Sequence, residues 1–184
     1  MKKSLPNYLT WSRVLMIPVI AVLILIPGTW ANYLSAALFC LVAVTDWLDG
    51  YLARKWKVES PFGAFLDPVA DKLLVVVLLI LLAIQGPEAL MIFSVLIIVS
   101  REIVISALRE WMAELGMRDA VKVAAIGKLK TTLQMMAIAL LLLAEPFSGS
   151  SIYETGLVIL YAAAAVTLVS MIQYLMAAAK SLST

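Results

Sequence analysis

The sequence contains no histidine and only one cysteine, Cys40. Histidine relays, zinc sites built from Cys and His, c-type haem attachment and intramolecular disulfides are therefore excluded. Charged residues are scarce as well: they make up 14% of the 184 residues, whereas 64% are hydrophobic and the mean hydropathy is +1.02. A soluble chain of this length cannot bury so much apolar surface in one core, so the lipid bilayer must solvate part of it.

Basic residues are missing from three stretches that separate the apolar runs. No Lys or Arg lies in residues 27–32, 85–88 or 145–154. By the positive-inside rule these three connections face outward and both termini face the cytoplasm. The first apolar run lacks a small-residue cleavage site, so we expect no removable signal peptide. Because membrane topology accounts for the basic residues, we expect no nucleic acid partner.

The apolar runs predict an all-α integral membrane protein that forms one domain over residues 1–184. A short N-terminal interfacial helix with aromatic anchors is expected over residues 1–12. A spanning helix needs roughly 20 residues, which leaves room for six transmembrane helices. We expect these spans over residues 13–27, 31–54, 62–85, 89–112, 127–144 and 152–179.

The second and third spans reach full length only if they include acidic residues. Extending them brings in Asp46 and Asp49 on the second span, and Asp67 and Asp71 on the third. Each pair is spaced to share one helix face, and Gly63 continues the stripe on the third span. Ionisable groups at membrane depth are costly unless they are paired, hydrated or metal-bound, so these aspartates are candidates for function.

An antiparallel hairpin that turns near residues 57–59 brings the two acidic pairs together. Asp46 and Asp71 are nearly equidistant from this turn, and so are Asp49 and Asp67. Four carboxylates that meet in a low-dielectric setting repel one another unless protons or cations offset their charge. Since the donors are all oxygens, we expect two divalent cations, Mg²⁺ or Mn²⁺, just inside the cytoplasmic interface.

Small and basic residues flank the aspartates. Gly50, Ala53 and Gly63 let a nucleotide or phosphate approach the backbone closely, and Arg54 offers a bidentate fork for a diphosphate. Two alternatives stay open: paired intramembrane acids also occur in cation and proton carriers, and Gly and Ala also serve helix packing. A carrier is expected to show repeated halves, whereas only one half of this chain carries the acids.

From Asp46 to Asp71 the sequence resembles the signature of the CDP-alcohol phosphotransferase family, DxxDGxxAR followed by eight residues and GxxxDxxxD. Every fixed position of that signature is matched. The resemblance implies an enzyme with six transmembrane helices, a CDP-linked donor, a homodimer and two divalent metals on Asp46, Asp49, Asp67 and Asp71. It also implies that Asp71 is the general base that takes the proton from the acceptor hydroxyl.

Residues 6–13, 101–111 and 127–131 resemble the bacterial subfamily that makes phosphatidylglycerophosphate. This resemblance implies CDP-diacylglycerol as donor and glycerol 3-phosphate as acceptor, with the active site on the cytoplasmic side of the bacterial cytoplasmic membrane. It adds Asn7, Thr10 and Arg13 to the donor-binding residues. A sibling enzyme with another acceptor, such as serine, inositol phosphate or a second lipid, remains the alternative.

Four basic residues are candidates for binding the acceptor's phosphate: Arg101, Arg109, Lys128 and Lys130. Arg101 and Arg109 lie within about 80° of each other on a helix, so both are expected to face one cavity. A cationic pocket beside the metals suits an acceptor that carries phosphate. Two alternatives stay open: Arg109 and the two lysines anchor helix ends, and Arg101 forms an internal ion pair with Glu102.

Overall fold

The computed structural model describes residues 5–56, 61–117, 125–144 and 150–182; within these ranges the side chains of residues 5–10, 47–56, 61–65, 67, 125, 126 and 128 lie outside the description. The described residues form an all-α fold. Their helices are α1 (Leu5–Leu25), α2 (Thr29–Trp56), α3 (Pro61–Gln85), α4 (Ala89–Glu114), α5 (Ala125–Leu143) and α6 (Ser151–Leu182). The expected all-α class is therefore confirmed for this part of the chain.

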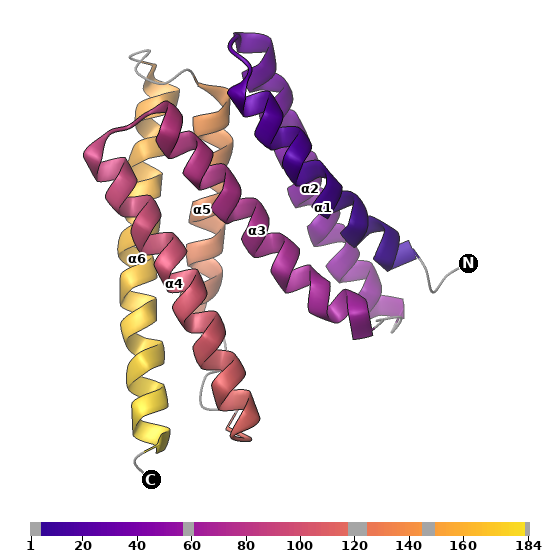
Figure 1. Cartoon of the computed structure of the whole chain (residues 1–184), viewed down its shortest axis with the longest axis vertical. Coiled ribbons are helices and arrows are strands. Elements are labelled where there is room, and N and C mark those ends of the chain that lie inside the picture. The colour runs from indigo at the N-terminus through magenta and orange to yellow at the C-terminus, as the bar shows by residue number, and fades with distance from the viewer. Residues whose placement is uncertain (1–4, 57–60, 118–124, 145–149, 183–184) are drawn as a thin grey trace.

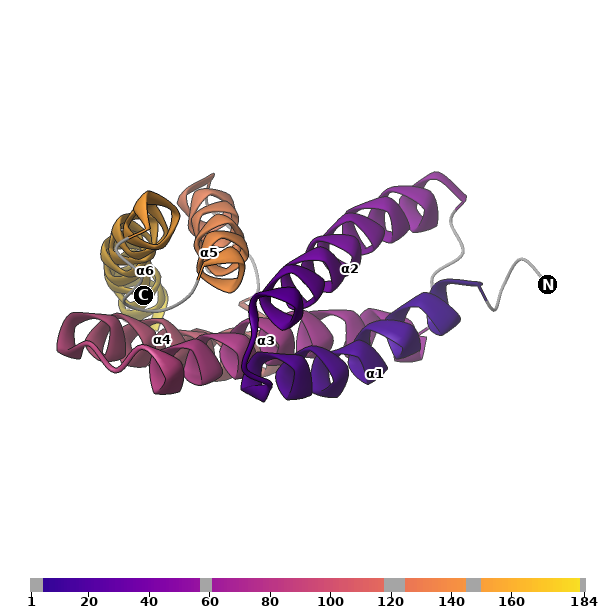
Figure 2. The same cartoon turned by 90° about the horizontal axis from the view of Figure 1, so that it is seen from above.

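The helices are arranged in two layers. In the view from above, α1, α3 and α4 form one layer and α2, α5 and α6 form the other (Figure 2). α1 packs against both α2 and α3, while α5 packs against α6 and α4 also contacts α6. The sequence predicts that α2 and α3 pair directly as a hairpin, but among the described residues α1 is the main packing partner of both.

Two glycines with positive φ mark helix ends. Gly28, at φ 130°, lies in the short connection between α1 and α2, where Pro27 cannot continue the first helix. Gly116, at φ 74°, follows the end of α4. The backbone N–H of Met117 donates to the carbonyl of Met112, and that of Gly116 donates to Ala113. This is a Schellman motif, which satisfies carbonyls that the helix end leaves without partners.

The described part of the expected interfacial segment, residues 5–12, is not a separate element, because residues 5–25 form one continuous helix. Pro6 lies in the first turn of α1, where a missing N–H costs nothing. No other residue before the apolar run breaks the helix. The aromatic anchors and the first apolar run therefore belong to one element.

The buried core draws on all the helices just described. Each contributes a side chain that is at most 1% exposed: Ile20, Phe39, Leu78, Ile98, Ile138 and Leu160. The outer surface is also apolar, and Leu15, Ile103, Val158 and Met176 are more than half exposed. A surface of this kind is compatible with lipid and not with water.

Three helical stretches among the described residues are long and apolar enough to cross a membrane. They are Pro68–Gln85, Ala89–Glu114 and Ser151–Leu182, and the most apolar 18 residues of each have mean hydropathies of 2.2, 2.2 and 2.1. Trp11–Leu25 and Leu129–Leu143 are shorter apolar helical stretches. Residues 27–32 and 85–88, which carry no basic side chain, lie at the same end of the molecule as the start of α6, and the ends of α4 and α6 lie at the opposite end (Figure 1).

The membrane orientation can be measured with single cysteines introduced into a Cys40→Ser background. We expect cysteines at Thr29 and Pro87 to react with a membrane-impermeant maleimide in intact cells, because their end of the molecule carries no basic residue. A cysteine at Met117, at the opposite end, is expected to react only after the membrane is permeabilised. The reversed labelling pattern would contradict the orientation derived from charge.

Candidate active site

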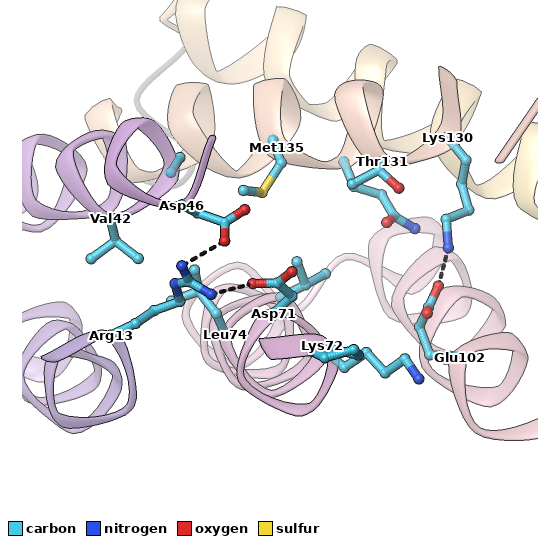
Figure 3. Close-up of a pocket in the computed structure, with 14 residues that line it drawn as sticks. Arg13, Val42, Asp46, Asp71, Lys72, Leu74, Glu102, Lys130, Thr131 and Met135 are labelled. Carbon is cyan, nitrogen blue, oxygen red and sulfur yellow. Dashed lines mark hydrogen bonds and ion pairs between the residues drawn. The ribbon is translucent and has the colours of Figure 1, made fainter. Parts of the chain in front are cut away.

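A single arginine joins three helices at the predicted aspartate site. Arg13 of α1 is only 3% exposed, and its Nη2 lies 2.5 Å from Oδ1 of Asp46 on α2. Its Nη1 donates a hydrogen bond to Oδ1 of Asp71 on α3 at 3.0 Å (Figure 3). Asp46 and Asp71 therefore lie at matching levels of their helices, as their spacing in the sequence predicts. The family resemblance placed Arg13 among the donor-binding residues. Its bridge between Asp46 and Asp71 cannot be predicted from the spacing of the two aspartates.

The bridge forms part of the wall of a pocket of about 250 Å³. Six of the residues that line this pocket carry charge: Arg13, Asp46, Asp71, Lys72, Glu102 and Lys130. The remaining lining residues are Val42, Ala43, Pro68, Leu74, Val75, Thr131, Gln134 and Met135. A concave site with an apolar wall and a few converging charges is typical of a binding site for a small molecule.

A second group of charges lies on the α4 and α5 side of the pocket. The ammonium group of Lys130 on α5 donates a hydrogen bond to Oε1 of Glu102 on α4 (Figure 3). Lys72 of α3 donates to the hydroxyl of Ser106 at 2.6 Å. The hydroxyl of Ser106 in turn donates to the backbone carbonyl of Glu102. Glu102 is thus linked to cationic side chains from two neighbouring helices.

Arg101 and Arg109 do not share one cavity. Arg101 is 6% exposed, and its Nη2 donates to the hydroxyl of Ser170 on α6 at 3.0 Å, with its guanidinium carbon 5.5 Å from the ring centroid of Tyr174. Arg109 is exposed, and neither arginine is among the residues lining the pocket. The reason is that α6 covers only one face of α4. The alternative of an internal ion pair is confirmed, since Arg101 Nη1 lies 3.4 Å from Glu102 Oε1.

Several predicted site residues have side chains outside the described part of the structure. They are the metal candidates Asp49 and Asp67, the donor candidates Asn7, Thr10, Gly50, Ala53, Arg54 and Gly63, and the acceptor candidate Lys128. Their backbones belong to α1, α2, α3 and α5. α2 is continuous from Asp46 to Asp49 and α3 from Asp67 to Asp71, so the predicted helical spacing within each pair holds for the backbone.

The described acidic residues are chemically suited to hold hard cations. Among the side chains that the structure describes, no group of three or more metal-binding residues is present, but Asp46 and Asp71 do converge. Both offer carboxylate oxygens, the donors that Mg²⁺ and Mn²⁺ prefer. The guanidinium between them shows that this position attracts positive charge. The residues present therefore fit a divalent cation site.

Among the polar residues of the pocket, Lys72, Thr131 and Gln134 were not assigned a role from the sequence, and Glu102 was assigned only that of an ion-pair partner of Arg101. Lys72 and Glu102 were visible as charges beside Asp71 and Arg101, but neighbours in sequence point to different sides of a helix. Thr131 and Gln134 follow Lys130 by one and four residues on α5. Gln134 is buried and donates to the hydroxyl of Thr167 on α6 at 3.5 Å. Because Gln134 lies four residues after Lys130, on the same face of α5, helical periodicity in the sequence is a signal that could have identified it.

The fold and the pocket together define an all-helical membrane protein whose site is suited to cations and to phosphate-bearing groups. The chain belongs to the CDP-alcohol phosphatidyltransferase family, whose family model matches residues 3–173. It is therefore an enzyme of this type.

Proteins of known name resemble the chain over nearly its whole length. Relatives from Salmonella choleraesuis (strain SC-B67), Escherichia coli (strain K12) and Shigella flexneri serotype 5b (strain 8401) are each 46% identical over 178 residues, which is 97% of this chain and 96% of the relative. All three are named CDP-diacylglycerol–glycerol-3-phosphate 3-phosphatidyltransferase.

The bridge by Arg13 predicts a link between stability and divalent cations. Arg13→Gln leaves Asp46 and Asp71, whose side chains are 38% and 50% exposed, without their shared cation. We expect the purified variant without divalent ions to lose about 2 kcal/mol of stability, which lowers Tm by roughly 4–8 °C. Added Mg²⁺ should raise Tm more in the variant than in the wild type. The matched control is Arg109→Gln, which removes an exposed arginine; an equal Tm for the two variants would contradict the proposed role of the bridge.

Proposed function

We propose that this chain transfers the phosphatidyl group from CDP-diacylglycerol to glycerol 3-phosphate, forming phosphatidylglycerophosphate and CMP. The observation that carries the proposal is the pocket, in which the carboxylates of Asp46 and Asp71 lie together with the amines of Lys72 and Lys130. Membership of the CDP-alcohol phosphatidyltransferase family and the names of the 46% identical relatives support the same donor and acceptor.

The four aspartates Asp46, Asp49, Asp67 and Asp71 would hold two divalent cations, Mg²⁺ or Mn²⁺. Members of this family generally use divalent metal ions. When bound, such ions neutralise the negative charge of a diphosphate and of the departing phosphate. The convergence of Asp46 and Asp71 on one guanidinium supports this proposal, because two of the four carboxylates are already at one place.

Asp71 is proposed to act as the general base. Its side chain is half exposed and lines the pocket, so an acceptor hydroxyl can reach it. The carboxylate takes the proton of the terminal hydroxyl of glycerol 3-phosphate. The hydroxyl oxygen forms a bond to the phosphorus that carries diacylglycerol, the bond from this phosphorus to the bridging diphosphate oxygen breaks, and CMP leaves. In the absence of substrates, Arg13 donates to Asp71 and holds its carboxylate at the pocket.

The donor is proposed to lie along the α1, α2 and α3 side of the pocket. The residues proposed to contact it are Asn7, Thr10, Arg13, Gly50, Ala53, Arg54 and Gly63. Of these, Arg13 has a described side chain, and its guanidinium lies at the aspartates. A donor diphosphate that enters with cations offers Arg13 a new anionic partner.

The acceptor's phosphate is proposed to bind on the α4 and α5 side. Lys130 supports this proposal, because it is buried and lines the pocket, and Lys72 adds a second amine. Lys128 was predicted to join them, and its side chain lies outside the described residues. Arg101 and Arg109 are weaker candidates for direct contact, since neither lines the pocket. Two amines on this wall favour a phosphate-bearing acceptor over serine.

The enzyme is proposed to cross the bacterial cytoplasmic membrane six times and to work as a homodimer. Both termini and the active site are placed on the cytoplasmic side. The distribution of Lys and Arg supports this orientation, and the three long apolar helical stretches support a membrane location. The family resemblance supports the homodimer.

The acceptor is tested with purified protein, CDP-diacylglycerol, Mg²⁺ and one alcohol at a time. We expect release of CMP with glycerol 3-phosphate and little release with serine, inositol phosphate or a second lipid. Asp71→Asn is the matched control, because it keeps the size of the side chain and removes the base. Release that requires another alcohol would assign the enzyme to a sibling activity, and release that persists in Asp71→Asn would contradict the role of this residue.

Steady-state kinetics on Lys130→Gln test the acceptor side of the pocket. We expect the apparent KM for glycerol 3-phosphate to rise by one to two orders of magnitude, because a charge-assisted hydrogen bond contributes about 1.5–3 kcal/mol. The KM for CDP-diacylglycerol should stay within a few-fold. Lys180→Gln, an exposed charge change near the end of α6, is the control. Arg109→Gln should have a smaller effect than Lys130→Gln, since Arg109 is exposed. Equal damage to both substrates would assign Lys130 to the fold instead.

A further inference from the structure

A chain of polar contacts behind the pocket connects three helices. It begins at Lys130 of α5, whose amine donates to Glu102 of α4 (Figure 3). Glu102, with a side chain that is 12% exposed, is also paired with Arg101 at 3.4 Å. Arg101 then reaches α6, where it donates to Ser170 and lies over the ring of Tyr174. Of these contacting residues, all of which the structure describes, Lys130 and Glu102 line the pocket.

These polar contacts restrain the side chain of Lys130, which is flexible by nature. A lysine has four rotatable methylene bonds, and holding its amine at one place costs conformational entropy. Glu102 is largely buried and is tied to a buried arginine, so it offers Lys130 a fixed acceptor. The ammonium group has three donors, and the bond to Glu102 uses one of them. The remaining donors are left to serve a ligand in the pocket.

The charge of the group is as important as its geometry. A pair formed by Glu102 and Lys130 alone is neutral and has little attraction for an anion. Arg101 adds a second positive charge, so the three residues together remain positive. Tyr174 supports this buried guanidinium with the negative face of its ring, and Ser170 accepts one of its hydrogen bonds.

We propose that Glu102 is a positioning residue, which holds the amine of Lys130 toward the acceptor's phosphate and is itself held by Arg101, anchored on Ser170 and Tyr174 of α6. This inference rests on the proposed function, since it requires an acceptor that carries phosphate. It gives Arg101 an indirect role in acceptor binding, because Arg101 holds Glu102 and does not contact the acceptor. It also gives α6, which contributes no residue to the pocket lining, a part in acceptor binding.

The test compares the KM for glycerol 3-phosphate with the KM for CDP-diacylglycerol in variants of the full chain. Glu102→Ala removes the acceptor of the Lys130 hydrogen bond and should raise the KM for glycerol 3-phosphate about ten-fold. Glu102→Gln keeps an oxygen that accepts this bond and should raise it less, by about three-fold. In both variants the KM for the donor should stay within about two-fold. A KM for glycerol 3-phosphate that falls in either variant would show that Glu102 competes with the phosphate, and the proposal would be wrong.

The α6 part of the proposal has its own pair of variants. Tyr174→Leu removes the ring under Arg101 and should raise the KM for glycerol 3-phosphate about three-fold. Tyr174→Phe keeps the ring, so its KM for glycerol 3-phosphate should stay near the wild-type value. Ser170→Ala is expected to act like Tyr174→Leu, and Lys180→Gln should leave both KM values unchanged. These variants change little volume at the pocket itself, so they keep the proposal testable if Glu102→Ala does not fold. Unchanged KM values in Tyr174→Leu and Ser170→Ala would overturn the anchoring by α6.

Failure of the proposed function has a different outcome. If the wild type uses another phosphorylated alcohol, glycerol 3-phosphate is the wrong acceptor, and the same comparison on that alcohol decides the role of Glu102. If the acceptor carries no phosphate, both the function and the positioning role are refuted. If the wild type uses glycerol 3-phosphate and the Glu102 variants raise both KM values equally, only the positioning role is refuted.

Discussion

The pairing of one buried guanidinium with two carboxylates sets the position of the first three helices. Charges in an apolar environment are costly unless they are partnered, and Arg13, Asp46 and Asp71 meet this requirement for one another. Each of these residues comes from a different helix, so the requirement acts on the fold as well as on the site. α1 lies against both α2 and α3 because its only basic side chain has its partners there. Apolar packing alone, which is similar on many helix faces, does not select such an arrangement.

The pocket has chemically different sides because different groups of helices, each drawn from both layers, line it. α1, α2 and α3 bring the aspartates and Arg13, whereas α4 and α5 bring Glu102 and Lys130. Lys72 follows Asp71 on α3 and reaches across to Ser106 of α4, so it connects the two sides. A reaction that joins two phosphate-bearing substrates needs two such subsites beside each other. The arrangement keeps the charges of each subsite paired while no substrate is present, which suits a site next to lipid.

Much of the fold was predictable from the sequence, because its signals are local. Long apolar runs that end at Pro or Gly placed α3 and α4 within two residues of their observed ends at both sides. The proximity of Asp46 and Asp71 followed from their equal spacing about one turn. Arg13 was different: its partners lie on other helices, and no spacing within α1 reveals which helix approaches it. For the same reason Arg101 and Arg109 looked equivalent, although α6 covers only the first.

The balance of charge in the pocket gives a physical reason to expect cations together with the substrates. Among the described lining residues, the positive Arg13, Lys72 and Lys130 are equal in number to the negative Asp46, Asp71 and Glu102. Described lining charges that sum to zero do not compensate the charges of a diphosphate and a phosphate monoester that enter together. In a low-dielectric surrounding this excess negative charge is strongly unfavourable. Divalent cations that enter with the donor would remove it, and by binding the two carboxylates they would leave Arg13 able to meet a phosphate. Binding of the cations and binding of each anionic substrate are therefore expected to be mutually favourable, since the cations supply the counter-charge that the substrates need.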